Sequence, residues 1–429
     1  MKRLGFLNTS DKYCLLRILP SLKTLLFYDI LYSRGEVMFE YRGFMLDSVR
    51  HMQSLDEIKK LVDAIALLGF NKFHWHLTDD QGWRFECDSF PELNTVAAVR
   101  PYSDFGKTRI NEPYGRVYSK DEMREVVAYC AEKGLDVIPE FDVPGHTSAL
   151  LSAMPELSCE GRKVKIKTHQ GIFKDVLCLA NEKTFEVVTA IIDEFLEIFP
   201  GEYFHIGGDE APSRHWKHCP HCQKRMKELG VKSYAEYQNC FMNRLIDYLE
   251  SKGRHCIVWN EAARGANLDK RAIIQYWKEK EKPSIDFINS GGKAILSPFS
   301  YCYLDYDYLI TPLNRVYSLN SDIPGLTDEG KKNIVGVEAP IWTEYISDIN
   351  RLEELLFPRI IAVSKVALAE NNKPYTEFLC DVNEVRNRLS SYIFCNEKMW
   401  TKSRASMPLG WLKFVKDHYT IDFIKEQLF

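Results

Sequence analysis

The sequence predicts an α/β protein folded as a (β/α)8 barrel, the TIM-barrel architecture. From about Arg42 onward, short apolar runs alternate with amphipathic helical stretches, which is the pattern of repeated βα units around a parallel sheet. Eight such units follow one another. A barrel of this kind takes about 250 residues, and long loops between its units account for the rest of the stretch.

Eight short runs rich in apolar, aromatic and β-branched residues are the predicted strands. They lie at residues 43–46, 72–77, 136–141, 203–206, 255–259, 272–277, 294–296 and 334–339. The clearest helices are predicted over residues 55–68, 120–133, 184–198 and 234–252. A glycine or proline stands just past each of these helices, which is a common stop signal: Gly69, Gly134, Pro200 and Gly253.

The chain is expected to divide into three parts. Residues 1–36 form a short N-terminal extension, residues 37–370 form the barrel, and residues 371–429 form a helical tail packed on it. Within the tail, helical patterns cover residues 382–393 and 411–415. We find no internal repeat and no low-complexity tract.

Composition and charge exclude several classes of protein. The 429 residues are 45% hydrophobic and 27% charged, as in ordinary globular proteins. A formal net charge of -4 spread along the chain argues against a nucleic-acid partner. Near the N-terminus, Arg17 and Pro20 interrupt the apolar run, so neither a signal peptide nor a membrane span is predicted. Twelve cysteines at irregular spacing fit reduced thiols, and the expected location is the cytoplasm.

The most informative stretch runs from His205 to Glu210. It holds two adjacent carboxylates, Asp209 and Glu210, directly after an apolar run and two glycines. Neighbours on a regular strand point to opposite faces, so both carboxylates can serve one pocket only if the backbone turns here. Gly207 and Gly208 tolerate the dihedral angles of such a turn. The other four Asp-Glu pairs of the chain lie in amphipathic helical or turn-rich stretches and are expected on the surface.

Polar and aromatic residues gather at the ends of the predicted strands, where barrels of this kind build their active sites. Carboxylates and an arginine interleaved with tryptophans suit a sugar, because its hydroxyls take hydrogen bonds while its ring faces stack on aromatic side chains. These candidates are Arg42, Asp79, Asp80, Glu140, Asp142, His146, Asp209, Glu210, Trp259, Glu261, Trp277, Tyr303, Asp305, Trp342 and Glu344.

Several of these segments resemble motifs of glycoside hydrolase family 20, the β-N-acetylhexosaminidases. The matching segments are Tyr41 to His51, Phe73 to Arg84, Pro139 to His146, His205 to Glu210, Trp259 to Glu261, Gln275 to Trp277, Tyr303 to Asp305, and Glu338 to Glu344. They match in order and spacing and cover about residues 40 to 370.

The resemblance implies an exo-acting glycosidase that removes terminal N-acetylglucosamine, with N-acetylgalactosamine as a possible second substrate. Catalysis would be substrate-assisted and retaining, through an oxazolinium intermediate, and without a metal or other cofactor. Glu210 would be the general acid and base, with a pKa raised by burial and by the charge of Asp209. Asp209 would hold the acetamide N–H, and Tyr303 would bind the acetamide oxygen.

The remaining roles also follow from the resemblance. Trp259, Trp277 and Trp342 would form the walls of the sugar site, and Arg42, Asp305 and Glu344 would bind remote hydroxyls. Asp79 and His146 would be a polar pair that tunes the acid. The implied partner is a small glycan, and a homodimer is compatible with the sequence. Family members commonly carry an α/β domain before the barrel, which residues 1–36 are too short to encode, so a barrel-only member and a piece of a longer chain both remain open.

Parts of the sequence are also compatible with other functions. The same family includes relatives for other sugars, such as lacto-N-biosidases and hydrolases of sulfated N-acetylglucosamine. His74 and His76 share one face of a strand, as in metal-dependent hydrolase barrels, and a non-catalytic sugar-binding barrel is a third reading. Cys219 and Cys222 form half of a zinc site, for which His215 and His218 are the nearest further ligands, although reduced thiols in a loop are the preferred interpretation.

Overall fold

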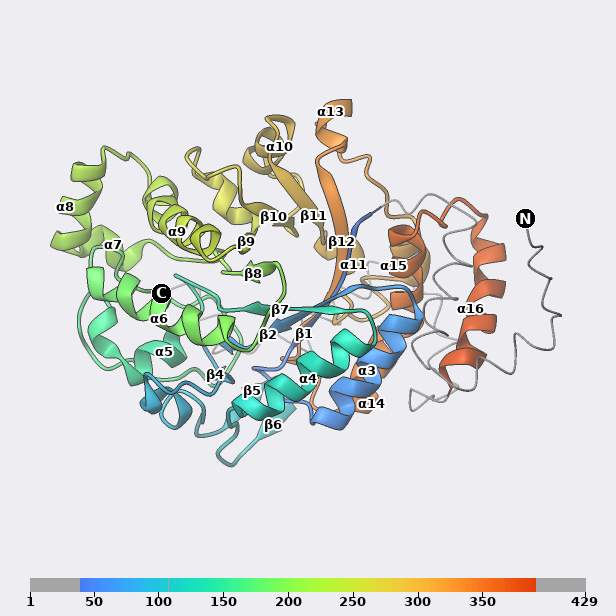
Figure 1. Ribbon diagram of the computed structural model, residues 1–429, viewed down its shortest axis with the longest axis horizontal. Coiled ribbons are helices and arrows are strands. Elements are labelled where there is room, and N and C mark those ends of the chain that lie inside the picture. The colour runs from blue at the N-terminus through green and yellow to red at the C-terminus, as the bar shows by residue number, and fades with distance from the viewer. Residues whose placement is uncertain (1–38, 107, 391–429) are drawn as a thin grey trace, which may run out of the picture.

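The computed structural model describes residues 39–106 and 108–390, and its centre is a closed parallel barrel of eight strands (Figure 1). Around the barrel the strand order is β1-β12-β11-β10-β9-β8-β7-β2. The barrel strands are β1 (Tyr41–Asp47), β2 (Lys72–His76), β7 (Asp136–Glu140), β8 (Tyr203–His205), β9 (His255–Trp259), β10 (Ile273–Tyr276), β11 (Lys293–Leu296) and β12 (Ile334–Ile341). The predicted (β/α)8 fold is confirmed, and each of the eight predicted strands is present with ends that agree within two residues.

Helices surround the barrel, and two short hairpins extend its loops (Figure 1). The helices are α3 (Leu55–Leu67), α4 (Lys120–Glu132), α5 (Ser148–Ala153), α6 (Glu182–Leu196), α7 (Arg214–His218), α8 (Pro220–Leu229), α9 (Tyr234–Ser251), α10 (Lys282–Asn289), α11 (Phe299–Cys302), α12 (Leu313–Tyr317), α13 (Asp328–Lys331), α14 (Ile349–Leu356), α15 (Arg359–Ala367) and α16 (Tyr375–Leu389). The hairpins pair β3 (Thr78–Asp79) with β4 (Gly82–Trp83), and β5 (Ser103–Phe105) with β6 (Thr108–Ile110). Short 3-10 turns lie at η1 (Pro91–Asn94), η2 (Pro155–Leu157) and η3 (Asn260–Arg264).

Local sequence explains where the long helices begin. Ser54, Ser119 and Ser233 stand immediately before α3, α4 and α9, and each accepts a hydrogen bond from the backbone of the glutamate three residues on. That glutamate bonds back to the backbone of the serine, which completes a capping box. These pairs satisfy amide groups that a helix start leaves without partners, so the boundaries of the three helices follow from residues close by in sequence.

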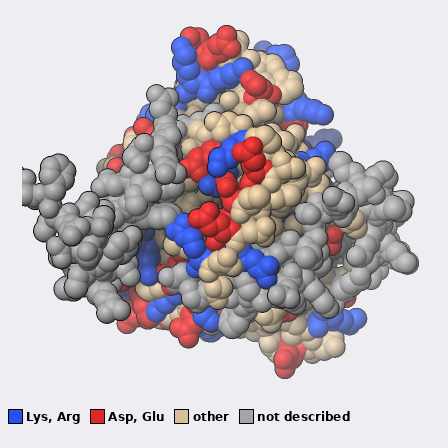
Figure 2. Space-filling model, turned by 90° about the vertical axis from the view of Figure 1, so that its right-hand side faces the viewer, with Lys and Arg blue, Asp and Glu red and all other residues tan. Residues whose placement is uncertain are grey.

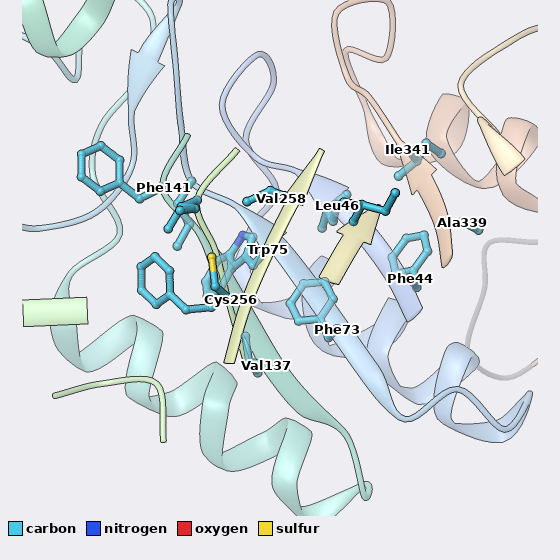
Figure 3. Close-up of a cluster of buried hydrophobic side chains, with 14 of the residues drawn as sticks. Phe44, Leu46, Phe73, Trp75, Val137, Phe141, Cys256, Val258, Ala339 and Ile341 are labelled. Atoms are coloured by element: carbon cyan, nitrogen blue, oxygen red, sulfur yellow. The ribbon is translucent and has the colours of Figure 1, made fainter. Parts of the chain in front are cut away.

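The barrel strands are buried on both faces, with different chemistry on each. Residues that point outward pack against the helices, as Phe44, Leu46, Phe73, Trp75 and Val258 do in Figure 3. Alternate residues point inward. A separate apolar cluster fills part of the interior: Tyr41, Ile138, Ile257, Ile273 and Ile295. Charged residues occupy further inward positions, so the barrel core also carries polar chemistry.

The tail was predicted to be helical and packed on the barrel. Its described part is α16, which begins at Tyr375, earlier than predicted. The ring of Phe378 stacks on Tyr317 with 4.0 Å between centroids, and Val382 and Leu389 are buried. The predicted helix over residues 411–415 and the N-terminal extension lie outside the described residues. Within residues 39–106 and 108–390, no helix combines the length and apolar character needed to span a membrane.

Candidate active site

A pocket opens at the carboxyl ends of the barrel strands, where the fold predicts it. Its volume is about 220 Å³. This is below the ~300 Å³ at which pockets for drug-sized ligands begin, and it suits a single sugar unit. It is lined by Arg50, Asp79, Asp142, His146, Gln170, Asp209, Glu210, Trp277, Tyr303, Asp305, Tyr306, Trp342, Glu344 and Tyr345. Of the eleven residues to which the resemblance gives a role, nine therefore line one cavity, and Arg42 and Trp259 do not.

The backbone turns after β8, as the two glycines predict. Gly207 and Gly208 have φ values of 66° and 101°, and Glu210 itself adopts a φ of 43°, which is uncommon for a residue with a side chain. A Cβ atom on Gly207 would lie 1.6 Å from Oδ1 of Asp142, so only glycine fits there. The backbone N–H of Glu210 donates to Oε2 of Glu261 at 3.0 Å. The turn directs both Asp209 and Glu210 into the pocket.

The carboxyl group of Glu210 is in an environment that favours its protonated form. Its pKa is raised, first by burial and then by the nearby charge of Glu261, while His146 and Lys278 oppose the shift. The expected repulsion between Glu210 and the adjacent Asp209 is present, since the charge of Glu210 raises the pKa of Asp209. Glu261 adds a second repelling carboxylate beside Glu210. A raised pKa favours the protonated carboxyl group that a general acid needs.

Asp209 is nearly buried, and its Oδ1 atom has no hydrogen-bond partner in the free protein. Burial raises its pKa well above the ordinary value, and the charge of Asp142 adds to this. Two other polar atoms of the pocket also have no partner, Nε1 of Trp277 and Oδ1 of Asp305. Buried polar groups without partners are costly. A ligand that donates to the two carboxylates and accepts from the indole would remove that cost.

His146 links the two carboxylates to a chain of buried polar groups. Its Nε2 atom lies 3.8 Å from Oδ2 of Asp209 and 3.7 Å from Oε2 of Glu210. Its Nδ1 atom lies 3.3 Å from Asp79 and 3.3 Å from Asp80. Burial opposes the charged imidazolium, but Asp79, Asp80 and Asp209 raise the pKa of His146 well above its usual range. The predicted pair of Asp79 and His146 therefore lies beside Glu210.

The chain continues into the barrel. Oδ2 of Asp79 lies 3.0 Å from Nε2 of His76, and Nδ1 of His76 contacts Glu140. Glu140 also accepts from Nε1 of Trp259 at 2.8 Å and lies 3.1 Å from Nδ1 of His205. Although burial opposes the charged form, Glu140 and Asp79 raise the pKa of His76 to about 10. An ion pair in the barrel interior thus supports the residues of the pocket from below.

The arginine of the pocket is Arg50, and the prediction of Arg42 for this role is wrong. Nη2 of Arg50 lies 2.6 Å from Asp79 and 3.8 Å from Glu344, and its guanidinium carbon is 5.1 Å from the ring centroid of Trp342. Arg42 is near the start of β1, at the opposite end of the barrel, where it donates to the backbone oxygens of Gly69 and Phe39. The site lies at the carboxyl ends of the parallel strands. An arginine that follows β1 can therefore reach it, whereas one near the start of β1 cannot.

Aromatic rings form one wall of the pocket. Trp277 stacks on Tyr303 with 5.9 Å between centroids, and the centroids of Tyr303 and Trp342 are 6.4 Å apart. Trp259 was predicted as a third tryptophan of this wall but does not line the pocket. It is buried, and its ring lies 5.8 Å from that of Trp342. Its indole N–H bonds to Glu140, which explains why a tryptophan at the end of β9 supports the wall from behind.

The model of "Glycosyl hydrolase family 20, catalytic domain" matches residues 39–370. This chain belongs to glycosyl hydrolase family 20. A beta-hexosaminidase of Porphyromonas gingivalis is 35% identical over 345 residues, which are 78% of this chain and 43% of that protein.

Solved structures of family 20 agree with the fold. A chitobiase of Flavobacterium johnsoniae superposes with a TM-score of 0.73 and 32% identity, over 83% of this chain and 52% of that one. A GH20 exo-β-N-acetylglucosaminidase of Vibrio harveyi, solved in complex with N-acetylglucosamine, gives a TM-score of 0.72 and 29% identity, over 83% of this chain and 58% of that one. The chain spans about half the length of the relatives it resembles.

His74 and His76, the two strand histidines of the alternative metal-dependent hydrolase, both lie among carboxylates inside the barrel. Nδ1 of His74 lies 2.9 Å from Glu338 and its Nε2 lies 3.2 Å from Glu140. His76 is held between Glu140 and Asp79. Both nitrogens of each ring therefore face carboxylates inside the barrel.

Four residues of the pocket were not among the predicted site residues: Arg50, Gln170, Tyr306 and Tyr345. Arg50 directly follows the first strand, which was a usable signal. Gln170, Tyr306 and Tyr345 lie on loops, where no periodic pattern in the sequence shows which way a side chain points. Tyr306 directly follows the predicted residue Asp305, and Tyr345 directly follows Glu344.

Proposed function

We propose that this chain is an exo-acting β-N-acetylhexosaminidase that hydrolyses a non-reducing terminal, β-linked N-acetylglucosamine and also accepts N-acetylgalactosamine. Family membership and the beta-hexosaminidase relatives support the reaction class. The single observation that carries the proposal is that Asp209 and Glu210 both reach the same nitrogen of His146, at 3.8 and 3.7 Å.

That arrangement supports a substrate-assisted mechanism. In the usual retaining scheme two carboxylates flank the scissile bond, and one of them attacks the anomeric carbon. Here the two carboxyl groups both lie within 3.8 Å of Nε2 of His146. In the proposed mechanism Asp209 orients the acetamide of the substrate, and the acetamide oxygen attacks the anomeric carbon in place of a carboxylate.

The proposed reaction has two steps. In the first, Glu210 gives its proton to the leaving oxygen while the acetamide oxygen bonds to the anomeric carbon and the glycosidic bond breaks. Asp209 accepts the acetamide N–H and stabilises the positive charge of the oxazolinium ion, and the hydroxyl of Tyr303 holds the acetamide oxygen in line. In the second, Glu210 takes a proton from water, which attacks the anomeric carbon and opens the ring with retention.

The rest of the pocket would select the sugar. Arg50, Asp305 and Glu344 offer charged partners for hydroxyls far from the anomeric carbon. Asp305 and Glu344 have raised pKa values, because both are buried and each acid is close to the charge of another carboxylate. Trp277 and Trp342 would stack on the ring and on the acetamide methyl group. The free state of all described cysteines supports a reducing compartment such as the cytoplasm.

The test uses chromogenic β-glycosides of N-acetylglucosamine, N-acetylgalactosamine and glucose. We expect turnover of the two N-acetyl sugars and none of the glucoside, because the latter lacks the internal nucleophile. Glu210→Gln should lower kcat by about 10²- to 10⁴-fold on the N-acetylglucosaminide, because Glu210 also activates the water of the second step. Asp121→Asn is the matched control, since Asp121 belongs to an Asp-Glu pair on α4 whose side chain is 93% exposed and meets only Arg124.

Three outcomes would contradict the proposal. Equal turnover of the glucoside would exclude substrate assistance. Turnover only of a disaccharide or sulfated glycone would favour the relatives with other specificity. Binding of N-acetylglucosamine without any turnover would leave a sugar-binding barrel.

A further inference from the structure

Four cysteines from two loops meet at one point outside the pocket. They are Cys159, Cys178, Cys219 and Cys222, and their sulfur atoms all lie within 4.8 Å of one another. The last three are buried and Cys159 is partly buried. None of the four lines the sugar pocket. The sequence showed only the pair at Cys219 and Cys222, and the structure supplies two further thiols from about 40 and 60 residues earlier in the chain.

The distances between the sulfur atoms fit a single metal ion. Sγ of Cys222 lies 3.8 Å from that of Cys159 and 3.7 Å from that of Cys178. A tetrahedral Zn²⁺ site with Zn–S bonds of ~2.3 Å places its sulfurs about 3.8 Å apart. A disulfide would need about 2.05 Å. A cluster of several iron atoms would hold its cysteines further apart, because each iron carries its own thiolate.

The fold builds the two halves of this group separately. Cys219 precedes α8 and Cys222 lies in its first turn, after Pro220 at the first helical position. The other half depends on an antiparallel bridge between Ser158 and Leu177, which brings the next residues, Cys159 and Cys178, together. The indole N–H of Trp216 in α7 donates to the backbone oxygen of Leu177 at 2.8 Å and so joins the halves.

The surroundings fit thiolate ligands. The hydroxyl of Tyr237 is buried beside Cys222. It is therefore available to donate to a metal-bound sulfur, as groups around metal ligands commonly do. The ring of Trp216 packs perpendicular to that of Tyr237 at 5.9 Å and covers this side.

The two histidines considered from sequence do not belong to the group. Nδ1 of His215 lies 2.9 Å from Oε1 of Glu160, and His218 is exposed. The ligand set is thus four sulfurs and no nitrogen, which is typical of zinc or iron and unlike the oxygen-rich sites of calcium or magnesium.

We propose that these four cysteines bind one Zn²⁺ ion as a closed structural site. All four coordination positions would be filled by the protein, so the ion would have no open position for water or substrate. The site would tie the loop after β7, which carries His146, to the loop after β8, which carries Asp209 and Glu210. It would thereby fix the relative position of the acid and its histidine without contacting the sugar.

The experiment is a metal analysis of the full chain, purified without a metal-affinity column. We expect one zinc per chain that survives dialysis against a chelator, and an X-ray absorption spectrum with four sulfurs at about 2.3 Å. A mercurial that reacts with thiols should release the zinc as four thiols are consumed. Substituting cobalt should give the strong visible absorption of a tetrahedral thiolate site. These measurements need no variant and do not depend on glycosidase activity.

A matched pair of double variants assigns the ligands. Cys219→Ser with Cys222→Ser should lose the zinc, whereas Cys240→Ser with Cys380→Ser, at thiols outside the group, should keep it. Wild-type protein without stoichiometric zinc, with iron instead, with nitrogen or oxygen ligands, or with disulfides between these cysteines would overturn the proposal. Equal zinc in the two double variants would do the same.

Discussion

Arg50 and Arg42 provide a direct test of how the pocket is built. Both arginines are about equally buried, with exposed fractions of 5% and 4%, and they belong to the same β1 region. Only Arg50 contacts residues of the pocket. The same substitution at both positions, Arg50→Lys and Arg42→Lys, keeps the positive charge and removes the forked geometry of the guanidinium.

The structure sets the expected size of the effect. Arg50 donates from Nη2 to Asp79 at 2.6 Å, from Nη1 to Asp47 at 3.2 Å and from Nε to Gln81 at 2.8 Å. A lysine has one nitrogen and cannot hold all three. Hydrogen bonds that involve a charged group contribute about 1.5–3 kcal/mol each. If one such bond positions Asp79 and the sugar, kcat/KM should fall about 10- to 100-fold.

Arg42→Lys should behave differently. Its lost bonds go to backbone oxygens at the closed end of the barrel, so we expect a loss of stability of about 1–3 kcal/mol and an unchanged kcat/KM. The assay is kcat/KM on the chromogenic N-acetylglucosaminide, with circular dichroism to establish that both variants are folded. An equal loss of kcat/KM in the two variants, or none in Arg50→Lys, would refute this assignment.

Three further predictions concern charge and backbone. Glu261→Gln removes a charge that raises the pKa of Glu210, so the high-pH limb of kcat/KM, where the acid loses its proton, should move to lower pH; an unmoved limb would assign it to another group. Burial raises the pKa of Asp305 from 3.8 to about 8, so the folded state keeps a proton that the unfolded state releases. Asp305 should therefore contribute a fall in stability between pH 4 and 8 of up to about 1.4 kcal/mol per unit. Chemical denaturation of Asp305→Asn should show a shallower slope, with the remainder due to other buried acids; an identical slope would contradict this. Gly207→Ala should abolish activity, because its Cβ would lie 1.6 Å from a carboxylate oxygen, whereas Gly134→Ala, with a similar φ and open space, should cost only about 1–2 kcal/mol of stability with normal activity.

Buried polar residues connect the interior of the barrel to the surroundings of Glu210. Glu140, His76 and Asp79 connect the middle of the barrel to His146 beneath Glu210. Buried charges of this kind are costly unless every member has a partner. On the outer surface, by contrast, basic and acidic side chains lie intermixed on the face drawn in Figure 2, and pairs exposed to water contribute little.

The sequence by itself determined the order and type of the secondary structure. The period of apolar residues, the serine and glutamate caps and the glycine stops are all local, so the strands and long helices could be assigned within a few residues. The pair of carboxylates after two glycines likewise predicted a turn into a pocket, and the structure confirms it. The family could be recognised because its motifs lie in short segments at strand ends.

Only the tertiary structure decided which distant residues meet. Arg50 rather than Arg42 enters the pocket because the direction of β1 places their ends on opposite sides of the barrel. Trp259 lies behind the wall because the side chains of β9 and Glu140 share the interior. Cys159 and Cys178 join Cys219 and Cys222 only after two loops fold back on each other. A local pattern reports the neighbours of a residue along the chain, whereas a site requires contacts across the barrel, and those depend on strand direction, register and loop path.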